Sequence, residues 1–597
     1  MSRAALKEYT ALGVILLAVF FIYISTTFPA FKSDDSPETA YTALTLGIGH
    51  PPGYPLYTLA GRIFTLIPLA SPAFRMNVFS SFLSLLVLLT AYFLIKHINL
   101  RIFGKSYMVI GYMAIWILAF SYIFWNQAIE AKGGIYILNL FFFAVIIMLS
   151  VILMEKFETR YLYLLLFVCG LGLANHWPSI ILLGPFVLYV LYAGRRSIDI
   201  NRAVFAVLFL CIGASPYIYL PIRASSMPVL NWGNPADTAG FWWVVLRKGY
   251  MSSTPLFYFS LNQLTNFTGI FHVNYGFLWL LFFPGIYILY RKERKTALYM
   301  LFILIFSSLS VIFYNPQQYS TTSTGAMWLM AVFLTTPLYL TGIFIGLGAG
   351  YLFLKAARGR APVAVALAVI FCVILVYTGT ANYRKNNSSR DYTAYDYGKN
   401  LIKSMDENSV FFAEGDYDTV PLVYLLGTGE NAGKPRMFPV TFLLFNWGIA
   451  EFNRRFGYVS MNEGNILASA SNILEKFYGK VPLYRSSVSP LFDALRKKYV
   501  QKQEGMAAVF GGAPVKSYIF ELYSYRGIYE KHALRDHNID MLAKYPVNMY
   551  NTALNLLSDG RRYYAVKILR RAAAFRGIKP EKRISLLYEK VTGGGVK

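Results

Sequence analysis

The chain has 597 residues, of which 56% are hydrophobic, 17% are aromatic and only 14% are charged, and its formal net charge is +26. A soluble protein of this length could not bury so much apolar surface, so the composition excludes an ordinary soluble protein and predicts one that lies in a lipid bilayer. The surplus of Lys and Arg is spread over both halves of the chain and forms no basic block interleaved with aromatic residues, which argues against a nucleic-acid partner. The three cysteines lie within apolar runs and form neither a disulfide framework nor a metal motif.

Apolar runs close to the roughly 20 residues that a helix needs to cross a bilayer predict about eleven spans. The fifth and sixth runs are short and could form one broken hairpin. The first run is too long for a signal peptide and no A-x-A-like site follows it, so we expect it to remain in the protein. The limits of the runs are 10–31, 76–96, 106–125, 134–154, 160–175, 177–193, 202–222, 269–290, 296–314, 325–354 and 361–380.

Lys and Arg orient these spans, because they are enriched in loops on the inner side of a membrane. With the N-terminus inside, the inner loops are basic, whereas the longer outer segments hold few basic residues. An odd number of spans then places residues 382–597 outside, on the same side as the acids of the first two outer loops. We therefore expect a multi-pass protein of the inner or plasma membrane whose active site and C-terminal domain are extracytoplasmic. The basic residues of the inner loops are Lys96, Arg101, Lys105, Lys156, Arg160, Arg195, Arg196, Arg202, Arg291, Lys292, Arg294, Lys295, Lys355, Arg358 and Arg360.

The first outer loop, SDDSPETAYTALTLGIGHPPGYPLY, begins with clustered acids. Adjacent carboxylates such as Asp34 and Asp35 repel each other, which raises the pKa of one of them unless a cation is nearby. A carboxylate with a raised pKa can act as a general base toward a hydroxyl nucleophile. The same residues also suit a solvated helix start, because Ser36-Pro37-Glu38 is a typical first turn. Both interpretations stay open.

The HPPGYP turn of the same loop fixes the backbone around two polar rings. Its three prolines and its glycine are expected to hold His50 and Tyr54 in place. The following YTLAGRIFTLIPLA is amphipathic and should lie along the membrane interface. A rigid surface turn without a further function is the alternative.

Two later outer loops carry further polar residues. In FWNQAIEAKGGIYILN, Glu130 and Lys132 could form a surface ion pair, or Glu130 could face the same cavity as Asp35. In NHWP, Asn175 and His176 stand where the chain turns outside, and a histidine so near the bilayer usually has a partner. A ligand, a phosphate contact and interfacial packing are all compatible with this pattern.

Arg223 stands at the membrane edge in the segment YLPIRASSMPVLNWGNP. Its guanidinium suits a phosphate diester and would equally suit a snorkelling anchor. The uncharged stretch at 315–325 could line a cavity or merely turn. The sequence contains no P-loop, dinucleotide-binding, HExxH or G-x-S-x-G motif, which favours an activated lipid over a nucleotide as the energy source.

Together these motifs resemble the protein O-mannosyltransferase-like family of the glycosyltransferase C superfamily. The resemblance rests on DSPETAYTALTLGIGHPPGYPLYTLAGR, WNQAIEAKGGIYILN, GLANHWPSIILLGP and YLPIRASSMPVLNWGNP, with a weaker stretch EGDYDTVPLVYL farther on. It covers residues 10–260 and patches beyond them. It implies a polyprenyl-phosphate sugar as the donor, used on the outer or lumenal face of the membrane.

The resemblance also implies roles for single residues. The family's D-S-G-E corresponds here to Asp35-Ser36-Pro37-Glu38, with proline in place of the usual glycine, and the acid of its A-x-E pattern corresponds to Glu130. We therefore expect catalytic roles for Asp35, Glu38 and Glu130. A divalent cation, if one is present, would be held by Asp34, Asp35 and Glu130. The expected donor-binding residues are His50, Tyr54, Lys132, Asn175, His176, Arg223 and Trp232.

From Asn382 on, the chain is more polar. SVFFAEGDYDT predicts a buried strand that ends in a loop, within an α/β domain over 382–540. Asp416 and Asp418 at this strand end could bind an acceptor or a cation, although capping is the commoner role. The tail, 541–597, resembles a tetratricopeptide-type helical pair, which cannot bury its own apolar face and should dock on the α/β domain.

The sequence thus predicts a polytopic α-helical membrane protein of the glycosyltransferase C type with about eleven transmembrane helices (1–381), an extracytoplasmic α/β domain (382–540) and a helical tail (541–597). The expected function is an inverting transfer of a sugar, mannose by the resemblance, to Ser or Thr of a secreted or envelope protein, with Asp35 as the base. Two alternatives remain. The acceptor could be an envelope lipid or polysaccharide, or the protein could be a lipid-linked transporter, which the absence of two similar halves disfavours.

Overall fold

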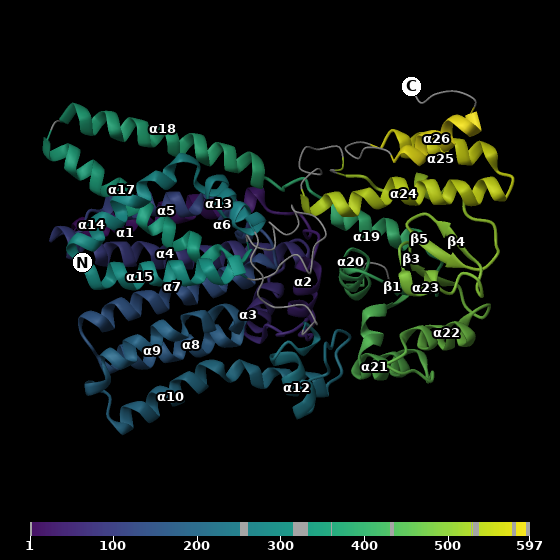
Figure 1. Ribbon diagram of the computed structural model, residues 1–597, viewed down its shortest axis with the longest axis horizontal. Helices are drawn as coiled ribbons and strands as arrows, with labels where there is room; N and C mark the ends of the chain where they lie inside the picture. The colour runs from purple at the N-terminus through teal and green to yellow at the C-terminus, as the bar shows by residue number, and fades with distance from the viewer. Residues whose placement is uncertain are drawn as a thin grey trace. The chain divides into compact units, whose positions relative to one another are not determined.

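The computed structural model describes residues 3–250, 261–313, 332–359, 361–429, 435–526, 528, 536–575 and 581–592. The stretch 315–325, for which the sequence predicts a cavity lining or a turn, lies outside the described residues. The chain, whose elements are labelled in Figure 1, divides into two compact units. The first consists of Met1–Thr27, Ala43–Pro228 and Pro235–Ser389, and the second of Phe28–Thr42, Val229–Asn234 and Arg390–Lys597.

The first unit is helical, because a helix satisfies the backbone hydrogen bonds of an apolar run within the run itself. Helix α2 (Ser36–Thr45) is shared by the two units, since their division falls between Thr42 and Ala43. The other helices of the first unit are α1 (Arg3–Thr26), α3 (Pro55–Thr65), α4 (Pro72–Phe103), α5 (Met108–Ala119), α6 (Tyr122–Ala128), α7 (Gly133–Glu155), α8 (Thr159–Ile180), α9 (Gly184–Ala193), α10 (Ile200–Ala214), α11 (Tyr219–Ser225), α12 (Thr238–Val245), α13 (Leu261–Tyr275), α14 (Phe282–Lys292), α15 (Arg294–Phe313), α17 (Thr335–Gly359) and α18 (Ala361–Asn386).

Nine described helical stretches are long and apolar enough to cross a membrane, and the pair α5–α6, bent by 71°, brings the number to ten. The chain is thus an integral membrane protein. The sequence predicts about eleven spans, and the difference from ten lies in the fifth and sixth runs, because this count takes Thr159–Ala193 as one stretch.

The stretch Thr159–Ala193 is folded back on itself. His176 has backbone angles of φ −149° and ψ 81°, which are not helical. Phe157 precedes the stretch and Gly194 follows it. A Cβ added to Gly194 would collide with the Phe157 ring, so the two ends of the stretch lie next to each other. A straight helix of this length would separate these ends by about 50 Å. The two runs therefore form the broken hairpin that the sequence allowed.

Ion pairs join several helices at one end of the first unit. Lys96 Nζ lies 2.5 Å from Glu8 Oε1, which ties α4 to α1. Arg101 Nε lies 3.7 Å from Glu155 and 3.4 Å from Glu293, which ties α4 to α7 and to the turn before α15. Arg101, from one predicted inner loop, thus forms ion pairs with Glu155 and Glu293, which lie at two other predicted inner loops. The side of the membrane on which this end lies stays a prediction.

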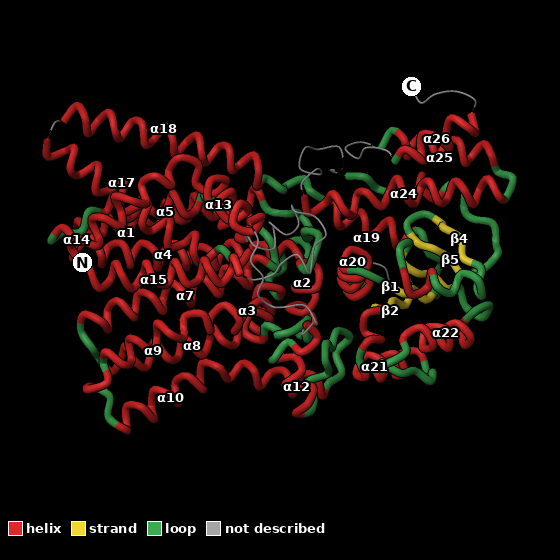
Figure 2. The backbone as a smooth tube through the Cα atoms, in the orientation of Figure 1, coloured by secondary structure: helices red, strands yellow, loops and turns green. Residues whose placement is uncertain are grey.

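The second unit is built on a five-stranded sheet in the order β2-β1-β3-β5-β4, whose strands are yellow in Figure 2. Its first three strands are parallel, and the last two are antiparallel to their neighbours, so that Val410 pairs with both Arg436 and Leu483. All four residues of β1 are buried, which confirms the strand predicted in SVFFAEGDYDT. The strands are β1 (Val410–Ala413), β2 (Arg436–Pro439), β3 (Leu483–Ser486), β4 (Gln501–Glu504) and β5 (Ala507–Phe510).

Helices cover this sheet and enclose a core rich in phenylalanine. Phe412 of β1 and Phe438 of β2 pack on Phe452, with ring centroids 6.4 and 5.0 Å apart. The helices that precede the tail are α19 (Thr393–Lys403), α20 (Asp416–Gly427), α21 (Asn446–Phe456), α22 (Ile466–Phe477) and α23 (Pro490–Asp493).

The C-terminal helices α24 (Asp536–Ser558), α25 (Arg562–Ala573) and α26 (Lys582–Thr592) belong to the same unit. The Asn555 amide donates to the Gln503 carbonyl at 3.1 Å, and Lys502 Nζ lies 2.8 Å from Asp559. The tail therefore docks on strand β4, as a single helical repeat requires. Helix α24 begins at Asp536, shortly before the predicted tail boundary at 541.

Candidate active site

The acids of the first predicted outer loop lie at the start of α2. Thr39 donates to the Asp35 carbonyl through its N–H and its hydroxyl, both at 2.9 Å, so the helix-start interpretation of this sequence is correct. Glu38, in the first turn, is buried. Asp34 has a half-exposed side chain that lies 3.6 Å from Lys32 Nζ. Of the two adjacent aspartates, Asp34 is therefore the one that faces solvent.

The HPPGYP turn is held from inside the fold. The Gly53 N–H donates to the His50 carbonyl at 2.9 Å, and Gly53 has φ 87°, a left-handed conformation that glycine adopts without strain. Tyr57, at the start of α3, donates its hydroxyl to the Ala131 carbonyl at 2.7 Å. Burial raises the pKa of the Tyr57 phenol, so it keeps its proton and this hydrogen bond. The turn is thereby tied to the loop that carries Glu130 and Lys132.

Lys132 forms the centre of a buried polar cluster in the first unit. Its Nζ lies 2.8 Å from His50 Nε2, 3.2 Å from the Tyr54 hydroxyl and 4.4 Å from the centroid of the Tyr54 ring. The side chains of His50 and Lys132 are both buried. An ammonium group has no acceptor, so His50 Nε2 must accept this hydrogen bond and the imidazole proton is on Nδ1.

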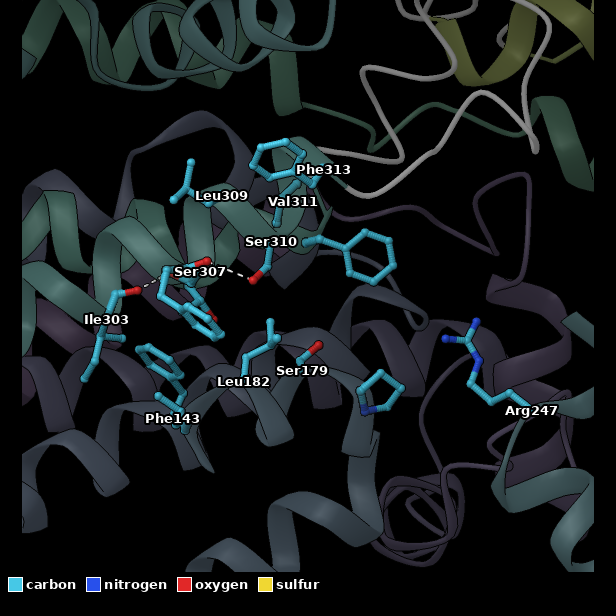
Figure 3. A pocket seen from close by; sticks show the side chains of 15 residues that line it. Phe143, Ser179, Leu182, Arg247, Ile303, Ser307, Leu309, Ser310, Val311 and Phe313 are labelled. Atoms are coloured by element: carbon cyan, nitrogen blue, oxygen red, sulfur yellow. Dashed lines mark hydrogen bonds between the residues drawn. The ribbon is translucent and has the colours of Figure 1, made fainter. Parts of the chain in front are cut away.

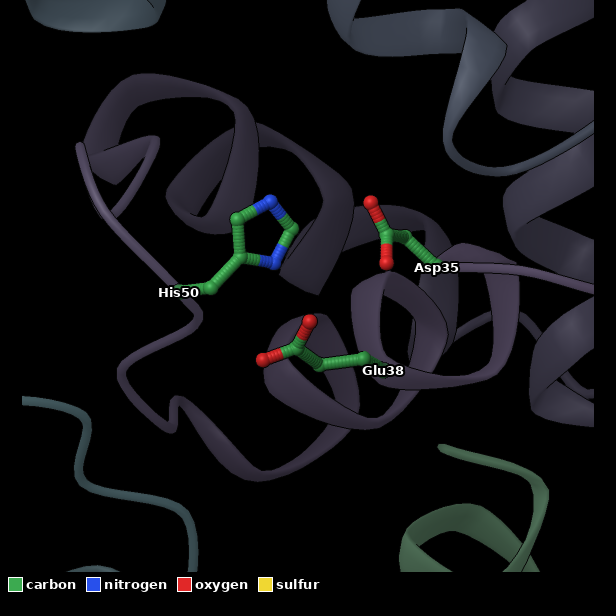
Figure 4. A group of neighbouring side chains, drawn as sticks. All are labelled: Asp35, Glu38 and His50. Carbon is green, nitrogen blue, oxygen red and sulfur yellow. The ribbon is translucent and has the colours of Figure 1, made fainter. Parts of the chain in front are cut away.

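One group of side chains in the described part of the chain has the spacing of metal ligands. It comprises Asp35, Glu38 and His50, whose ligand atoms lie within 4.8 Å of one another and which point toward one another in Figure 4. Asp34 and Glu130, named with Asp35 as cation ligands by the sequence, are not in this group. A metal ion at Nε2 would displace Lys132, and one at Nδ1 would require Nε2 to carry a proton facing an ammonium. The donor set therefore favours Lys132 over a metal ion as the positive charge at this imidazole.

His176, at the break of the hairpin, extends the cluster. Its ring stacks on Tyr54 with a centroid distance of 6.0 Å and an interplanar angle of 8°, and its Nδ1 lies 2.8 Å from the Ser179 hydroxyl. Lys132, His50 and Arg247 are all close enough to act on it electrostatically.

Asn175, its neighbour, donates to the Ile135 carbonyl at 2.9 Å and so joins α8 to α7. Asn175 therefore stabilises the position of the hairpin against α7, whereas His176 contacts the cluster through Tyr54.

Arg247 was not selected from the sequence. It lines a cavity of about 580 Å³ whose other walls are mainly apolar side chains of α7, of α15 and of the stretch from Pro178 to Leu183 (Figure 3). Its Nε is buried and has no hydrogen-bond partner within the described part of the chain. Its guanidinium lies 5.0 Å from the ring of Tyr250. These two residues begin and end the stretch RKGY, and this contact was the only feature of Arg247 that neighbouring residues could have indicated. Among the described residues, the cavity thus combines apolar walls with the guanidinium of Arg247 and the hydroxyl groups of Ser179, Ser307, Ser310 and Thr336.

Glu130 lies in the same loop as Lys132 and is only 2% exposed. It accepts a hydrogen bond from the Gln127 amide at 3.3 Å. Because both side chains are buried, Glu130 and Lys132 do not form the surface ion pair that the sequence allowed. The two glycines that follow Lys132 serve packing, since a Cβ on Gly134 would collide with the hydroxyl groups of Ser80 and Tyr57.

Two expected donor-binding residues are not brought to this cluster. The Arg223 guanidinium donates to the carbonyls of Leu46 at 2.6 Å and of Thr45 at 3.1 Å, where it caps the C-terminal end of α2. Trp232 belongs to the second unit, where its ring packs 4.7 Å from Phe442. Both side chains are occupied by structural contacts that depend on tertiary packing.

Comparison with known proteins gives matches over the first unit and beyond. Residues 35–199 match the family model of the protein O-mannosyl-transferase TMEM260 N-terminal domain. The protein O-mannosyl-transferase tmem260 of Dictyostelium discoideum is 26% identical over 471 residues, which are 70% of this chain and 56% of that protein. The Mus musculus protein O-mannosyl-transferase TMEM260 is 23% identical over 446 residues, which are 70% of this chain and 61% of that protein. The chain thus matches little more than half the length of these relatives.

Solved structures share the fold at low identity. ArnT from Cupriavidus metallidurans bound to undecaprenyl phosphate has a TM-score of 0.52 and 11% identity, covering 84% of this chain and 97% of ArnT. The apo oligosaccharyltransferase of Archaeoglobus fulgidus has a TM-score of 0.50 and 12% identity, covering 98% of this chain and 86% of that enzyme. The chain is thus similar to protein O-mannosyl-transferases of this family, in agreement with the resemblance that its sequence motifs carry, and it shares the fold of the two solved membrane enzymes.

Proposed function

We propose that the protein is a membrane glycosyltransferase that moves a sugar from a polyprenyl-phosphate carrier to a hydroxyl group of Ser or Thr in a secreted or envelope protein. The names of the relatives support mannose as the sugar. The reaction takes place on the outer face of the membrane, as the distribution of Lys and Arg predicts. It is a single displacement and inverts the configuration of the sugar.

The observation that carries this proposal is the buried cluster around Lys132. The ammonium of Lys132 and the guanidinium of Arg247 both act on His176, so two cations converge on one region of the first unit. A polyprenyl-phosphate sugar is a phosphodiester with one negative charge. When the sugar leaves, the carrier becomes a phosphate monoester with a second charge. Buried cations stabilise this developing charge strongly, because little water screens them.

The cavity next to Arg247 supports a lipid carrier. Its walls are apolar apart from Arg247 and a few hydroxyl groups, and its volume of about 580 Å³ suits several isoprene units near the phosphate. ArnT, which shares the fold, was crystallised with undecaprenyl phosphate. In our proposal the carrier chain occupies this cavity and the phosphate lies between Arg247 and Lys132.

The acids of the α2 segment provide the base. Asp35 takes the proton of the acceptor hydroxyl while its oxygen attacks the anomeric carbon opposite the phosphate. The bond from this carbon to the phosphate oxygen breaks, and its electron pair stays on the phosphate, where Lys132 and Arg247 receive the charge. Glu130, held by Gln127, orients the sugar through its hydroxyl groups. His50 holds Lys132 in place through Nε2. Glu38 stands beside Asp35 and His50 and helps to position the base.

The test uses the purified protein in nanodiscs with polyprenyl phosphate carrying labelled mannose, and carrying labelled glucose as the matched donor. Ser/Thr peptides, the same peptides with alanine, and envelope lipid extracts are offered as acceptors. We expect mannose on the Ser/Thr peptides, a loss of at least about a hundredfold in Asp35→Asn, and near-normal transfer in the control Asp34→Asn. Label in the lipid extract instead would establish the alternative acceptor. Full activity of Asp35→Asn would refute the assignment of the base.

A further inference from the structure

The segment that carries the candidate base belongs to the same compact unit as the C-terminal domain. Residues 28–42, which contain Asp35 and Glu38, are grouped with Arg390–Lys597, as are residues 229–234 of the LNWG stretch. In the latter, Trp232 packs on Phe442, and the Arg455 guanidinium donates to the Val229 carbonyl. The C-terminal domain therefore collects two segments that are far from it in sequence.

Helix α20 forms the contact surface for the acid-bearing segment. Phe31, which is 1% exposed, packs edge-on against Tyr424 with ring centroids 5.2 Å apart. Gly427 follows three residues later on the same face of α20. A Cβ on Gly427 would collide with the ring of Tyr41, which is 2% exposed. Phe31 and Tyr41 thus lie on the two sides of Asp35 in sequence, and both rest on one face of α20.

The beginning of α20 faces the same segment. Tyr417 is seven residues before Tyr424, two turns of helix away, and so lies on the same face. Burial raises the pKa of the Tyr417 phenol, and Asp34 raises it further while Lys32 lowers it. These effects place the charges of the acid-bearing segment close to Tyr417. The Phe31 ring also packs on Tyr395 of α19, with ring centroids 5.7 Å apart, so that a second helix contacts the same segment.

We propose that α20 is a positioning element for the base. By packing on Phe31 and Tyr41 it fixes where α2 begins, and because Asp35 precedes the first residue of α2, it fixes the direction of that carboxylate. The inference rests on the proposed role of Asp35. It makes the C-terminal unit part of the catalytic apparatus, in contrast to a detachable acceptor-binding module. Helix α20 is also the EGDYDTVPLVYL stretch that contributes to the family resemblance.

The test is a substitution in α20 that moves α2 without touching the first unit. Gly427→Ala puts a methyl group into the space of the buried Tyr41 ring. Gly512→Ala is the matched control, because it makes the same change in the same unit and nothing lies within 4 Å of the new Cβ. The double variant Gly427→Ala with Tyr41→Leu removes the ring atoms that the methyl group meets and should restore the fit.

For Gly427→Ala we expect kcat to fall at least about tenfold while KM for the polyprenyl-phosphate donor changes less than twofold, which separates positioning from donor binding. The double variant should regain at least threefold over Gly427→Ala, and Gly512→Ala should match the wild type. Hydrogen exchange of the amides in 36–42 is the second measurement, and it should be faster in Gly427→Ala than in Gly512→Ala. Unchanged exchange, or faster exchange with unchanged kcat, would overturn the inference. If the wild type transfers no sugar, the proposed function fails, and the exchange result still decides whether α20 holds α2.

Discussion

Replacing Lys132 by methionine tests the electrostatic basis of the proposed reaction most directly. Methionine keeps most of the apolar stem and removes the ammonium that lies 2.8 Å from His50 Nε2 and 4.4 Å from the Tyr54 ring. The Tyr54 hydroxyl lies 3.0 Å from the same nitrogen, so His50 keeps a hydrogen-bond donor in the variant. Removing one buried charge can destabilise a protein when it leaves a partner unpaired, so the stability of the variant is measured together with its activity.

The expected loss of activity follows from the burial of Lys132. Two unit charges about 4 Å apart interact by roughly 4 kcal/mol at an effective dielectric constant of about 20. Lys132 is only 7% exposed, so water screens it little. The leaving phosphate gains one negative charge, and losing about 4 kcal/mol of its stabilisation corresponds to roughly a thousandfold in kcat. Because Arg247 remains, the loss should fall between about a hundredfold and a thousandfold.

The assay is transfer of labelled mannose from polyprenyl phosphate to a Ser/Thr peptide, with thermal unfolding measured on the same preparations. Lys132→Arg keeps the charge in a different shape and should retain more activity than Lys132→Met. Lys156→Met is the matched control, because the Lys156 side chain is 80% exposed at the basic end of the unit. A folded Lys132→Met variant within threefold of the wild type would refute the reasoning.

Three further predictions concern stability, pH and metal ions. Lys544→Met removes the cation 2.8 Å from the buried Asp418 and should destabilise the second unit by about 3 kcal/mol in chemical unfolding, whereas Lys567→Met, in an exposed pair, should change nothing. Burial raises the pKa of Glu414 above 4.5, so its ionised form is disfavoured in the fold and stability falls as pH rises through the folded pKa. Glu414→Gln should therefore raise Tm at pH 7 and leave it unchanged at pH 4, and an equal gain at both pH values would contradict this cause. EDTA should leave transfer intact because Lys132 occupies His50 Nε2, and a loss that Mg²⁺ or Mn²⁺ restores would contradict the metal-free assignment.

Sequence patterns were sufficient to predict those features of the fold and the site that depend on residues close together in the chain. Apolar runs predict helices regardless of their neighbours, and the prolines of HPPGYP predict a fixed turn around His50 and Tyr54. The contact between Lys132 and His50 joins two loops, and the sequence had selected one of these residues from each loop as donor-binding. The sequence also divided the fifth and sixth runs between residues 175 and 177, and the stretch Thr159–Ala193 bends at His176, which lies between them.

Residues whose roles depend on packing could not be predicted in this way. Arg223 and Arg247 are both arginines in segments that the sequence predicts to be outer, and the sequence favoured Arg223. In the structure, the Arg223 guanidinium donates to the carbonyls of Thr45 and Leu46, which can accept these hydrogen bonds because α2 ends there. Arg247 lines the apolar cavity instead. No spacing rule distinguishes these two residues, since their partners are distant in sequence.

Helix α2 has contacts in both units. Its N-terminal part is packed on α20 through Tyr41, within the second unit. At its C-terminal end, Arg223 and Arg62 donate to carbonyls of residues 44–46, within the first unit. Since α2 has only ten residues, both sets of contacts lie within three turns of helix of Asp35. Under the proposed role of Asp35, we therefore expect substitutions that disturb the contacts at either end of α2 to lower kcat.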